Sequence, residues 1–270
     1  MIECQNAAKQ YPDFKLDITM EVPENTITAL LGLNGSGKTT LFRLLNGLMK
    51  PDSGTVSLFD ENAWTLSPAA KQKIGAVLSE SGFLPSLDIK QIRSILASFY
   101  KNFDQNYFNS LVSRFRLPQS KPLSEFSNGM KARIQVIAAL SHHPNLLLLD
   151  EPTAGLDIAA RNEILDLLRE YMEKPGHSIL ISSHIASDLE NFCDDFYLIS
   201  GGSIVLHDDI ESLKNNYAIL SVPENRIPDI DFREVVTRKK ISSGEKVLVK
   251  DRQYYEDNYP QMIECSKSSN

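Results

Sequence analysis

The chain has 270 residues, of which 42% are hydrophobic and 23% are charged, and its formal net charge is −7. The negative charge argues against a general nucleic-acid-binding surface, and the sequence has no run of about 18 apolar residues that could span a bilayer. Three scattered cysteines, Cys4, Cys193 and Cys265, favour reduced thiols over a disulfide framework or a zinc site.

The first 31 residues are expected to form short strands separated by turns. Residues 16–22 alternate apolar and polar side chains, which is the pattern of a half-buried strand. Tyr-Pro-Asp at residues 11–13 and Pro-Glu-Asn at residues 23–25 interrupt these strands as turns do. Residues 26–31 are mostly apolar and lead directly into a glycine-rich segment.

Residues 32–39, with the sequence GLNGSGKT, match the phosphate-binding P-loop pattern G-x-x-x-x-G-K-[ST]. The segment lies between the apolar run and an amphipathic helix that opens near Thr40, which is the strand–loop–helix context that the pattern requires. Glycines let backbone N–H groups turn toward phosphate oxygens, and the helix adds its positive N-terminal end. Lys38 can reach the β- and γ-phosphates, and Thr39 can hold Mg²⁺.

We therefore predict a binding site for ATP and Mg²⁺ at this loop. The alternative is a glycine-rich turn before a core helix, which the lysine, the threonine and the flanking pattern disfavour. The nucleotide contacts are expected from Asn34, Gly35, Ser36, Gly37, Lys38, Thr39 and Thr40.

The rest of the chain alternates apolar runs with helical patterns. The P-loop helix should end near Lys50, because proline follows it. Helical spacing of apolar residues dominates from residue 87 to about 140. The other elements expected, in chain order, are strands at 55–59 and 74–78, helices at 89–99, 108–115 and 130–140, strand 146–149, helix 159–172, strand 178–182, helix 185–192 and strand 195–199. This β-α-β rhythm predicts an α/β fold: a P-loop NTPase core with a mostly parallel sheet, an N-terminal antiparallel β part and an inserted helical subdomain.

Two domains are predicted. The ATPase domain should cover residues 1–215, with its core at 1–86 and 141–215 and the helical subdomain at 87–140. Beyond residue 213 the pattern weakens, and residues 216–270 are expected to form a small extension. Within it, residues 232–236 and 246–250 could pair around 242–245, and residues 266–270 are expected to be disordered.

Two carboxylates are expected beside the P-loop. Asp150 and Glu151 follow four leucines, residues 146–149, in a run typical of a central parallel strand. Burial of that strand places Asp150 at its carboxyl end, where parallel sheets bind ligands. Asp150 would help to hold Mg²⁺, and Glu151 would accept a proton from the attacking water or orient it. The alternative is an acidic cap after a core strand.

These motifs together resemble the ABC-type ATPases. Residues 150–157, DEPTAGLD, resemble the family's Walker B and D-loop motifs, and residues 126–131, FSNGMK, resemble its signature loop, usually LSGGQ. Residues 182–184, SSH, resemble the switch histidine and its neighbours. Tyr11 lies where the family stacks an aromatic ring on adenine. The resemblance covers roughly residues 1–215, with all motifs in the family's order.

In the family, the signature loop and the D-loop contact the nucleotide held by a second subunit. The resemblance extends this role to Ser127, Asn128, Gly129 and Asp157, although Phe126, Asn128 and Met130 depart from the usual Leu, Gly and Gln. Ser127 could instead be a plain N-cap of the helix that follows, and Asp157 could cap its helix alone or cap it and line the dimer interface as well.

The resemblance also implies roles for two aromatic or titratable side chains. His184 would lie near the γ-phosphate, or else be a core histidine or a helix cap. Tyr11 would stack on adenine, or else be an ordinary core or surface tyrosine. His142 and His143, just before Pro144, are expected to be exposed loop residues.

The family's Q-loop glutamine is missing after strand 74–78. An ungapped alignment places Ser79 there, and a one-residue shift places Glu80, which would then bind the metal. Acidic residues here resemble the antibiotic and lantibiotic exporter branch. The apolar side chains that follow belong to Phe83, Leu84, Pro85 and Leu87. In the family this surface receives a short helix of the membrane subunit, but ordinary packing under the helical insertion is the alternative.

The resemblance implies an ATP-hydrolysing subunit that powers export, of antibiotic, peptide or drug type, through a separate transmembrane permease subunit. The expected location is cytoplasmic, at the inner face of the cell membrane, with a second ATPase subunit as partner and a homodimer favoured over a heterodimer. The alternatives are a non-transporter ABC ATPase and an ATP-dependent regulatory subunit without turnover. One ATPase half, a short insertion and a negative charge favour the transporter; the sequence does not identify the transported compound.

Overall fold

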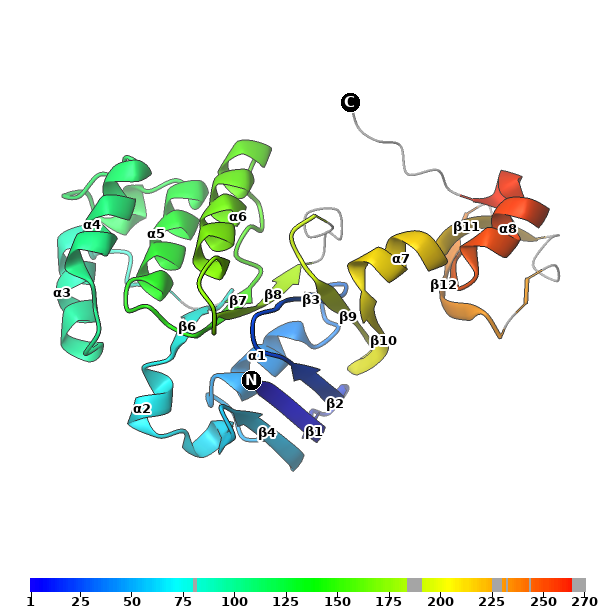
Figure 1. The fold of residues 1–270 in the computed structure, drawn as a ribbon, viewed down its shortest axis with the longest axis horizontal. Coiled ribbons are helices and arrows are strands. Elements are labelled where there is room, and N and C mark those ends of the chain that lie inside the picture. Colours follow the sequence, from blue (N-terminus) through cyan, green and yellow to red (C-terminus); the bar gives the residue numbers. More distant parts are fainter. Residues whose placement is uncertain (80–81, 184–190, 225–229, 232, 243, 264–270) are drawn as a thin grey trace. The chain divides into compact units, whose positions relative to one another are not determined.

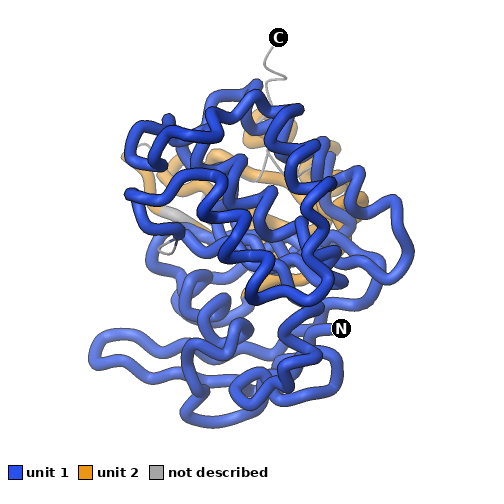
Figure 2. The backbone as a smooth tube through the Cα atoms, turned by 90° about the vertical axis from the view of Figure 1, so that its left-hand side faces the viewer, with its two compact units in different colours: residues 1–204 blue, residues 205–270 orange. Residues whose placement is uncertain are grey.

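In the computed structural model, residues 1–79, 82–183, 191–224, 230–231, 233–242 and 244–263 are described. The chain forms two compact units, Met1–Ile204 and Val205–Asn270, which are coloured separately in Figure 2. The predicted domain boundary at residue 215 stays a prediction. No helix within these ranges is both long enough and apolar enough to cross a membrane.

The first unit is built on one large sheet, which has ten strands in the described part of the chain (Figure 1). Its spatial order is β5-β4-β1-β2-β10-β9-β3-β8-β7-β6. The bounds are β1 Ile2–Gln10, β2 Lys15–Val22, β3 Ile27–Leu31, β4 Ser53–Leu58, β5 Glu61–Asn62, β6 Ile74–Val77, β7 Leu146–Asp150, β8 Ser178–Ser183, β9 Asp195–Ser200 and β10 Ser203–Asp209, the last continuing into the second unit.

The two ends of this sheet differ in strand direction. Strand β1 is antiparallel to β2 and β4, whereas β3, β6, β7, β8 and β9 pair in parallel. Every residue of β3, β7 and β8 is buried, as expected for central parallel strands. The predicted α/β class, with an N-terminal antiparallel part, is confirmed.

Helix α1 (Lys38–Leu45) positions the P-loop. Its apolar residues Leu41, Phe42, Leu44 and Leu45 belong to one core cluster with side chains from both the antiparallel and the parallel strands. The helix ends at Leu45, well before the predicted Lys50, with Asn46 as its C-cap and Gly47 next to it in the left-handed conformation (φ +62°) that commonly ends a helix.

The predicted helical insertion is confirmed. It contains α3 (Ile89–Phe99), η2 (Leu123–Glu125) and the helices α4 (Gln105–Arg114) and α5 (Asn128–Leu140). Before it lie η1 (Ala63–Thr65) and α2 (Pro68–Lys71), and α6 (Ile158–Met172) follows β7. Ion pairs Arg114–Glu170 and Arg133–Glu163 join the insertion to α6. The predicted helix 185–192 lies almost entirely outside the described residues.

The second unit is a three-stranded antiparallel sheet with short helices. Its elements are α7 (Ile210–Asn216), β11 (Ala218–Pro223), β12 (Val235–Ile241), β13 (Gly244–Val249), α8 (Arg252–Asn258) and η5 (Pro260–Met262). The expected hairpin is present, since Val235 pairs with Val249 and Ile241 with Gly244. Tyr255 of α8 is fully buried in the core of this unit. Residues 266–270, expected to be disordered, lie outside the described part.

Candidate functional site

The P-loop connects β3 to α1 through a backbone that only glycine accepts at key positions. Gly35 and Gly37 have φ angles of +79° and +112°. A Cβ on Gly37 would lie 2.7 Å from Cδ1 of Leu16, and one on Gly32 would lie 2.6 Å from the carbonyl oxygen of Ile199. The loop is thus fixed by the strands beneath it as well as by its own turns.

Lys38, the first residue of α1, folds back across this loop. Its Nζ lies 2.7 Å from the carbonyl oxygen of Gly32 and 3.3 Å from that of Leu33. The same atom lies 3.2 Å from Oε1 of Glu151. The side chain is only 6% exposed, so its charge is held inside the loop by carbonyl dipoles and one carboxylate.

Asp150 is the centre of the site. Its carboxylate is fully buried and accepts three hydroxyl hydrogen bonds: from Thr39 at 2.9 Å and Ser79 at 2.7 Å on Oδ2, and from Ser182 at 2.7 Å on Oδ1. These donors come from α1, the segment after β6, and β8. These three hydroxyl donors offset the desolvation cost of burying the carboxylate.

Strand register explains why these groups meet. In the parallel ladders Val77 of β6 is opposite Leu149 of β7, and Asp150 is opposite Ser182 of β8. The carboxyl ends of three strands therefore lie at one edge, beside the P-loop. We call the six side chains gathered there the Asp150 cluster: Lys38, Thr39, Ser79, Asp150, Glu151 and Ser182.

Glu151 sits just after β7 in a left-handed backbone conformation, with φ +53°. Its N–H donates a 2.9 Å hydrogen bond to Oγ of Ser182. Its side chain is 14% exposed and turns toward Lys38. The predicted neighbours Lys38, Thr39, Asp150 and Glu151 are thus brought together, while their roles stay predictions.

Two predicted site residues, Glu80 and His184, lie outside the described residues. Ser79, which the sequence offered only as the alternative to Glu80, donates its hydroxyl to Asp150. Ser182 had no predicted role of its own. The signal for it was its place as the first residue of the SSH motif, directly after the apolar residues 179–181 of the same strand.

The signature segment, residues 126–131, opens helix α5. Ser127 is the N-cap, its Oγ accepting the Met130 N–H at 3.2 Å, and Phe126 before it is 4% exposed. Ser127 and Asn128 are exposed. Asp157 likewise caps α6, accepting the Ala160 N–H at 2.8 Å. Both side chains are therefore N-caps, and the expected contact with a second subunit's nucleotide, which capping does not exclude, stays a prediction.

Tyr11 lies in the turn between β1 and β2. Its N–H donates to the Phe14 carbonyl oxygen at 2.7 Å, its hydroxyl contacts the Met49 sulfur at 3.3 Å, and its ring centroid is 6.2 Å from that of Phe14. Phe14 was not predicted to be near the site, yet it borders the P-loop at Gly37. Adenine stacking by Tyr11 stays a prediction.

The prediction of two exposed histidines is wrong for His142. Its ring is 2% exposed, stacks on Tyr100 with centroids 3.8 Å apart, and places Nε2 2.9 Å from the Ile74 carbonyl oxygen. The chain here returns from the insertion to β7 and packs against the start of β6, which buries the ring. Burial lowers the pKa of His142 to about 4. His143 is exposed as predicted, with Nε2 3.2 Å from Oδ2 of Asp104.

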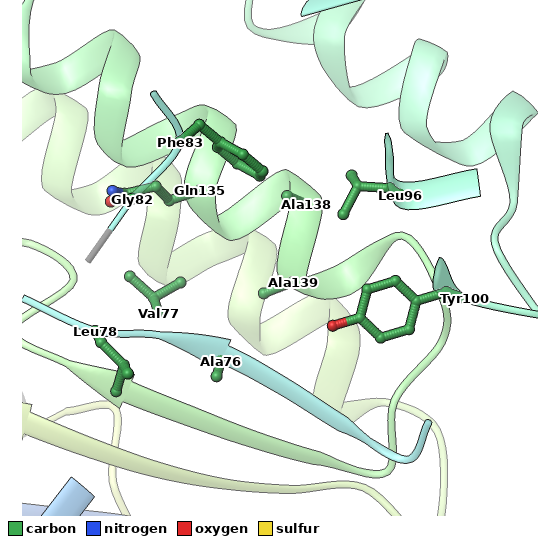
Figure 3. A pocket seen from close by; sticks show the side chains of 10 residues that line it. All are labelled: Ala76, Val77, Leu78, Gly82, Phe83, Leu96, Tyr100, Gln135, Ala138 and Ala139. Carbon is green, nitrogen blue, oxygen red and sulfur yellow. The ribbon is translucent and has the colours of Figure 1, made fainter. Parts of the chain in front are cut away.

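A cavity of about 250 Å³ lies between β6, α3 and α5 (Figure 3). Phe83, from the loop after the sheet, projects into it, and Tyr100 and Gln135 contribute its polar groups. Leu84, the next residue of that loop, is 68% exposed. Phe83 is thus partly buried at this cavity, whereas Leu84 presents an apolar side chain at the surface, and both the docking role and the packing alternative stay predictions.

Known proteins are similar to this chain in sequence and in fold. The family model described as ABC transporter matches residues 16–154. The ABC transporter ATP-binding protein YtrB of Bacillus subtilis is 32% identical over 86% of this chain and 83% of its own. The bacitracin transport ATP-binding protein BcrA of Enterococcus faecalis is 33% identical over 84% and 76%. A solved structure of the ATP binding subunit of an ABC transporter, 25% identical, superposes with a TM-score of 0.71 over 79% of this chain and 91% of that one.

Proposed function

The chain belongs to the ABC transporter ATP-binding proteins, and from this premise we propose that it powers export through a separate membrane permease subunit. As a member of this family it binds nucleotide and hydrolyses ATP. What remains to be assigned is which side chains carry the reaction and which surfaces receive the partners.

The Asp150 cluster is the observation that supports this assignment. Lys38 would exchange its contacts with loop carbonyls and Glu151 for the β- and γ-phosphates, to which it adds a positive charge. Released from Lys38, the Glu151 carboxylate would accept the proton of the attacking water or orient that water. The Lys38 ammonium group, which pairs with Glu151, lies where the phosphates would bind. Phosphate binding by Lys38 and water activation by Glu151 would therefore occur side by side.

The donor set around Asp150 also fits Mg²⁺. All its members are hard oxygen ligands: the Asp150 carboxylate and the hydroxyls of Thr39 and Ser79. Both hydroxyls lie at the same carboxylate oxygen, Oδ2. Thr39 and Asp150 would hold the ion; Glu80 stays the third predicted ligand, and Ser79, which donates to Asp150, is its alternative. Bound there, Mg²⁺ would neutralise charge on the phosphates.

We propose that a second ATPase subunit, preferably a second copy, completes the site. Leu33 in the P-loop and Ile158 after Asp157 are 68% and 74% exposed. Large apolar side chains beside a polar site favour a surface that another subunit covers. Ser127, Asn128, Gly129 and Asp157 would then face the nucleotide of that partner, as the family resemblance implies.

Leu84 is proposed to contact the permease. Similarity to a bacitracin transport protein favours export of an antibiotic-type compound, with the chain held at the inner face of the membrane by the permease. The compound itself stays open, since its selection would depend on the permease.

The test is to purify the native complex and identify the membrane protein that accompanies the chain. Leu84→Glu should abolish permease binding and transport while basal ATP hydrolysis persists, because this side chain is exposed. Ile219→Glu, at a 47% exposed position in the second unit, is the control and should leave both unchanged. If the chain is purified from cells that express a permease and no membrane protein accompanies it, the transporter assignment is refuted.

A further inference from the structure

Where β7 ends, one buried hydroxyl joins the two carboxylate residues of the site. Ser182 is 1% exposed, its Oγ donates to Oδ1 of Asp150 at 2.7 Å, and the same oxygen accepts the N–H of Glu151 at 2.9 Å. Asp150 and Ser182 are opposite one another in the β7–β8 ladder. A single side chain therefore bridges a carboxylate and the backbone of the next residue.

This bridge has a structural reason. β7 ends at Asp150, and the next residue, Glu151, has a left-handed backbone with φ +53°. Its partly buried N–H needs an acceptor, which the Ser182 hydroxyl provides. A left-handed glutamate is an uncommon and strained conformation, which persists only when its surroundings determine it.

We infer that Ser182 is a positioning residue for ATP hydrolysis, acting through Glu151 and Asp150 rather than on the nucleotide itself. It fixes the backbone from which the Glu151 carboxylate projects, and it occupies Oδ1 of Asp150 so that Oδ2 faces Thr39 and Ser79. The inference rests on the proposed role of Glu151. It assigns a function to a serine that neither the P-loop nor the carboxylate pair includes.

The expected consequence is a split between binding and turnover. Ser182→Ala leaves the P-loop and Lys38 intact, so ATP affinity should change by less than about threefold. Without the bridge the Glu151 carboxylate is no longer held, and kcat should fall about 10- to 100-fold, the rate equivalent of one hydrogen bond to a charged group. Ser182→Thr keeps the hydroxyl and should recover most of the lost kcat.

Ser178→Ala is the matched control. Ser178 is in the same strand and fully buried, and its Oγ donates to the Pro23 carbonyl oxygen at 3.1 Å, away from the Asp150 cluster. Removing that hydroxyl should lower thermal stability much as Ser182→Ala does, while kcat stays at the wild-type value. If Ser182→Ala does not fold, Ser182→Cys applies the same test, because a thiol is a weaker acceptor of similar size.

A double mutant separates positioning from general destabilisation. If Ser182 acts through Glu151, adding Ser182→Ala to Glu151→Gln should slow turnover little further, because coupled residues are not additive. Additive losses, equal losses of affinity and kcat, or a matching loss in Ser178→Ala would overturn the inference. If Ser182→Ala keeps the wild-type kcat while Glu151→Gln is slow, the role of Ser182 is refuted and the role of Glu151 stands. A fast Glu151→Gln refutes the proposed role of Glu151 itself.

Discussion

The Asp150 cluster and the signature segment are both expected to act on ATP, yet the chain satisfies their polar groups in different ways. In the Asp150 cluster a fully buried carboxylate accepts hydroxyls from three separate elements, and a lysine that is 6% exposed contacts a glutamate. In the signature segment the Ser127 hydroxyl accepts a hydrogen bond from the first turn of its own helix, and Ser127 and Asn128 are exposed.

The two regions differ in whether a single chain supplies the partners of their polar groups. Buried groups must find partners within the chain, since each unpaired one would cost about 1–3 kcal/mol. Exposed groups are satisfied by water and stay available to a second surface. The Asp150 cluster should therefore tolerate no change of partner, whereas the signature segment should matter only when another subunit is present.

The largest effects should come from the Asp150 cluster. Glu151→Gln should retain ATP binding but slow hydrolysis about 10²-fold or more if the carboxylate acts as the base. Lys38→Ala should instead weaken ATP binding, because the phosphate charge loses its partner. Nucleotide affinity and phosphate release measured on both variants distinguish the two roles. Lys71→Ala, on the exposed side of α2, is the control for loss of a lysine. Near wild-type turnover in Glu151→Gln would contradict the assignment.

The next test asks whether the signature segment works across a subunit boundary. Ser127→Arg should inactivate a homodimer by blocking the neighbouring nucleotide, while the monomer stays folded, since this position is exposed. Mixing it with Lys38→Ala should restore part of the activity, because one composite site of the mixed dimer then carries neither substitution. ATPase assays on mixtures measure this, and Ser113→Arg on the exposed surface of α4 is the control. Mixed dimers that form but remain inactive would count against action in trans.

A smaller effect should distinguish the two candidates for the Q-loop position. Ser79 donates to Asp150 at 2.7 Å, so Ser79→Ala should raise the Mg²⁺ concentration needed for half-maximal ATP binding about tenfold, as for other residues that support a metal ligand. If Glu80 takes this position instead, Glu80→Gln should relax the Mg²⁺ requirement and Ser79→Ala should have little effect. Titrating ATP binding with Mg²⁺ for both variants decides between the residues.

The sequence predicted the parts of this structure that local chemistry determines. The P-loop glycines, the leucine run of β7 and the helical spacing of the insertion each depend on neighbouring residues, and all three are where they were expected. Contacts between distant segments were not predictable in this way. Strand register brings Ser182 to Asp150, and the chain near Ala63 comes so close to Gly47, two residues after α1, that a Cβ there would lie 2.4 Å from the Ala63 carbonyl oxygen. In the second unit, β11 and α8 lack a strong pattern because a small core needs few apolar positions.

His142 and His143 repeat the comparison between buried and exposed groups at adjacent positions. The folded-state pKa of His142 is about 4, below its ordinary value of 6.5, because burial disfavours the charged ring. The unfolded chain therefore takes up a proton first, and stability is lost as pH falls from about 6.5 toward 4. Between pH 7.5 and 5.5 the loss attributable to this ring should be about 1 kcal/mol.

Urea unfolding of His142→Gln at the two pH values tests this, with His143→Gln as the control. The His142 variant should be less stable than wild type at pH 7.5, because the stack on Tyr100 and the bond to the Ile74 carbonyl are impaired. Its difference in stability between the two pH values should, however, be smaller by about 1 kcal/mol. His143→Gln should keep most of the wild-type difference, since burial is the largest cause of the lowered pKa of His142 and the His143 ring is exposed. An unchanged pH difference in His142→Gln would mean that the buried ring takes up its proton without unfolding.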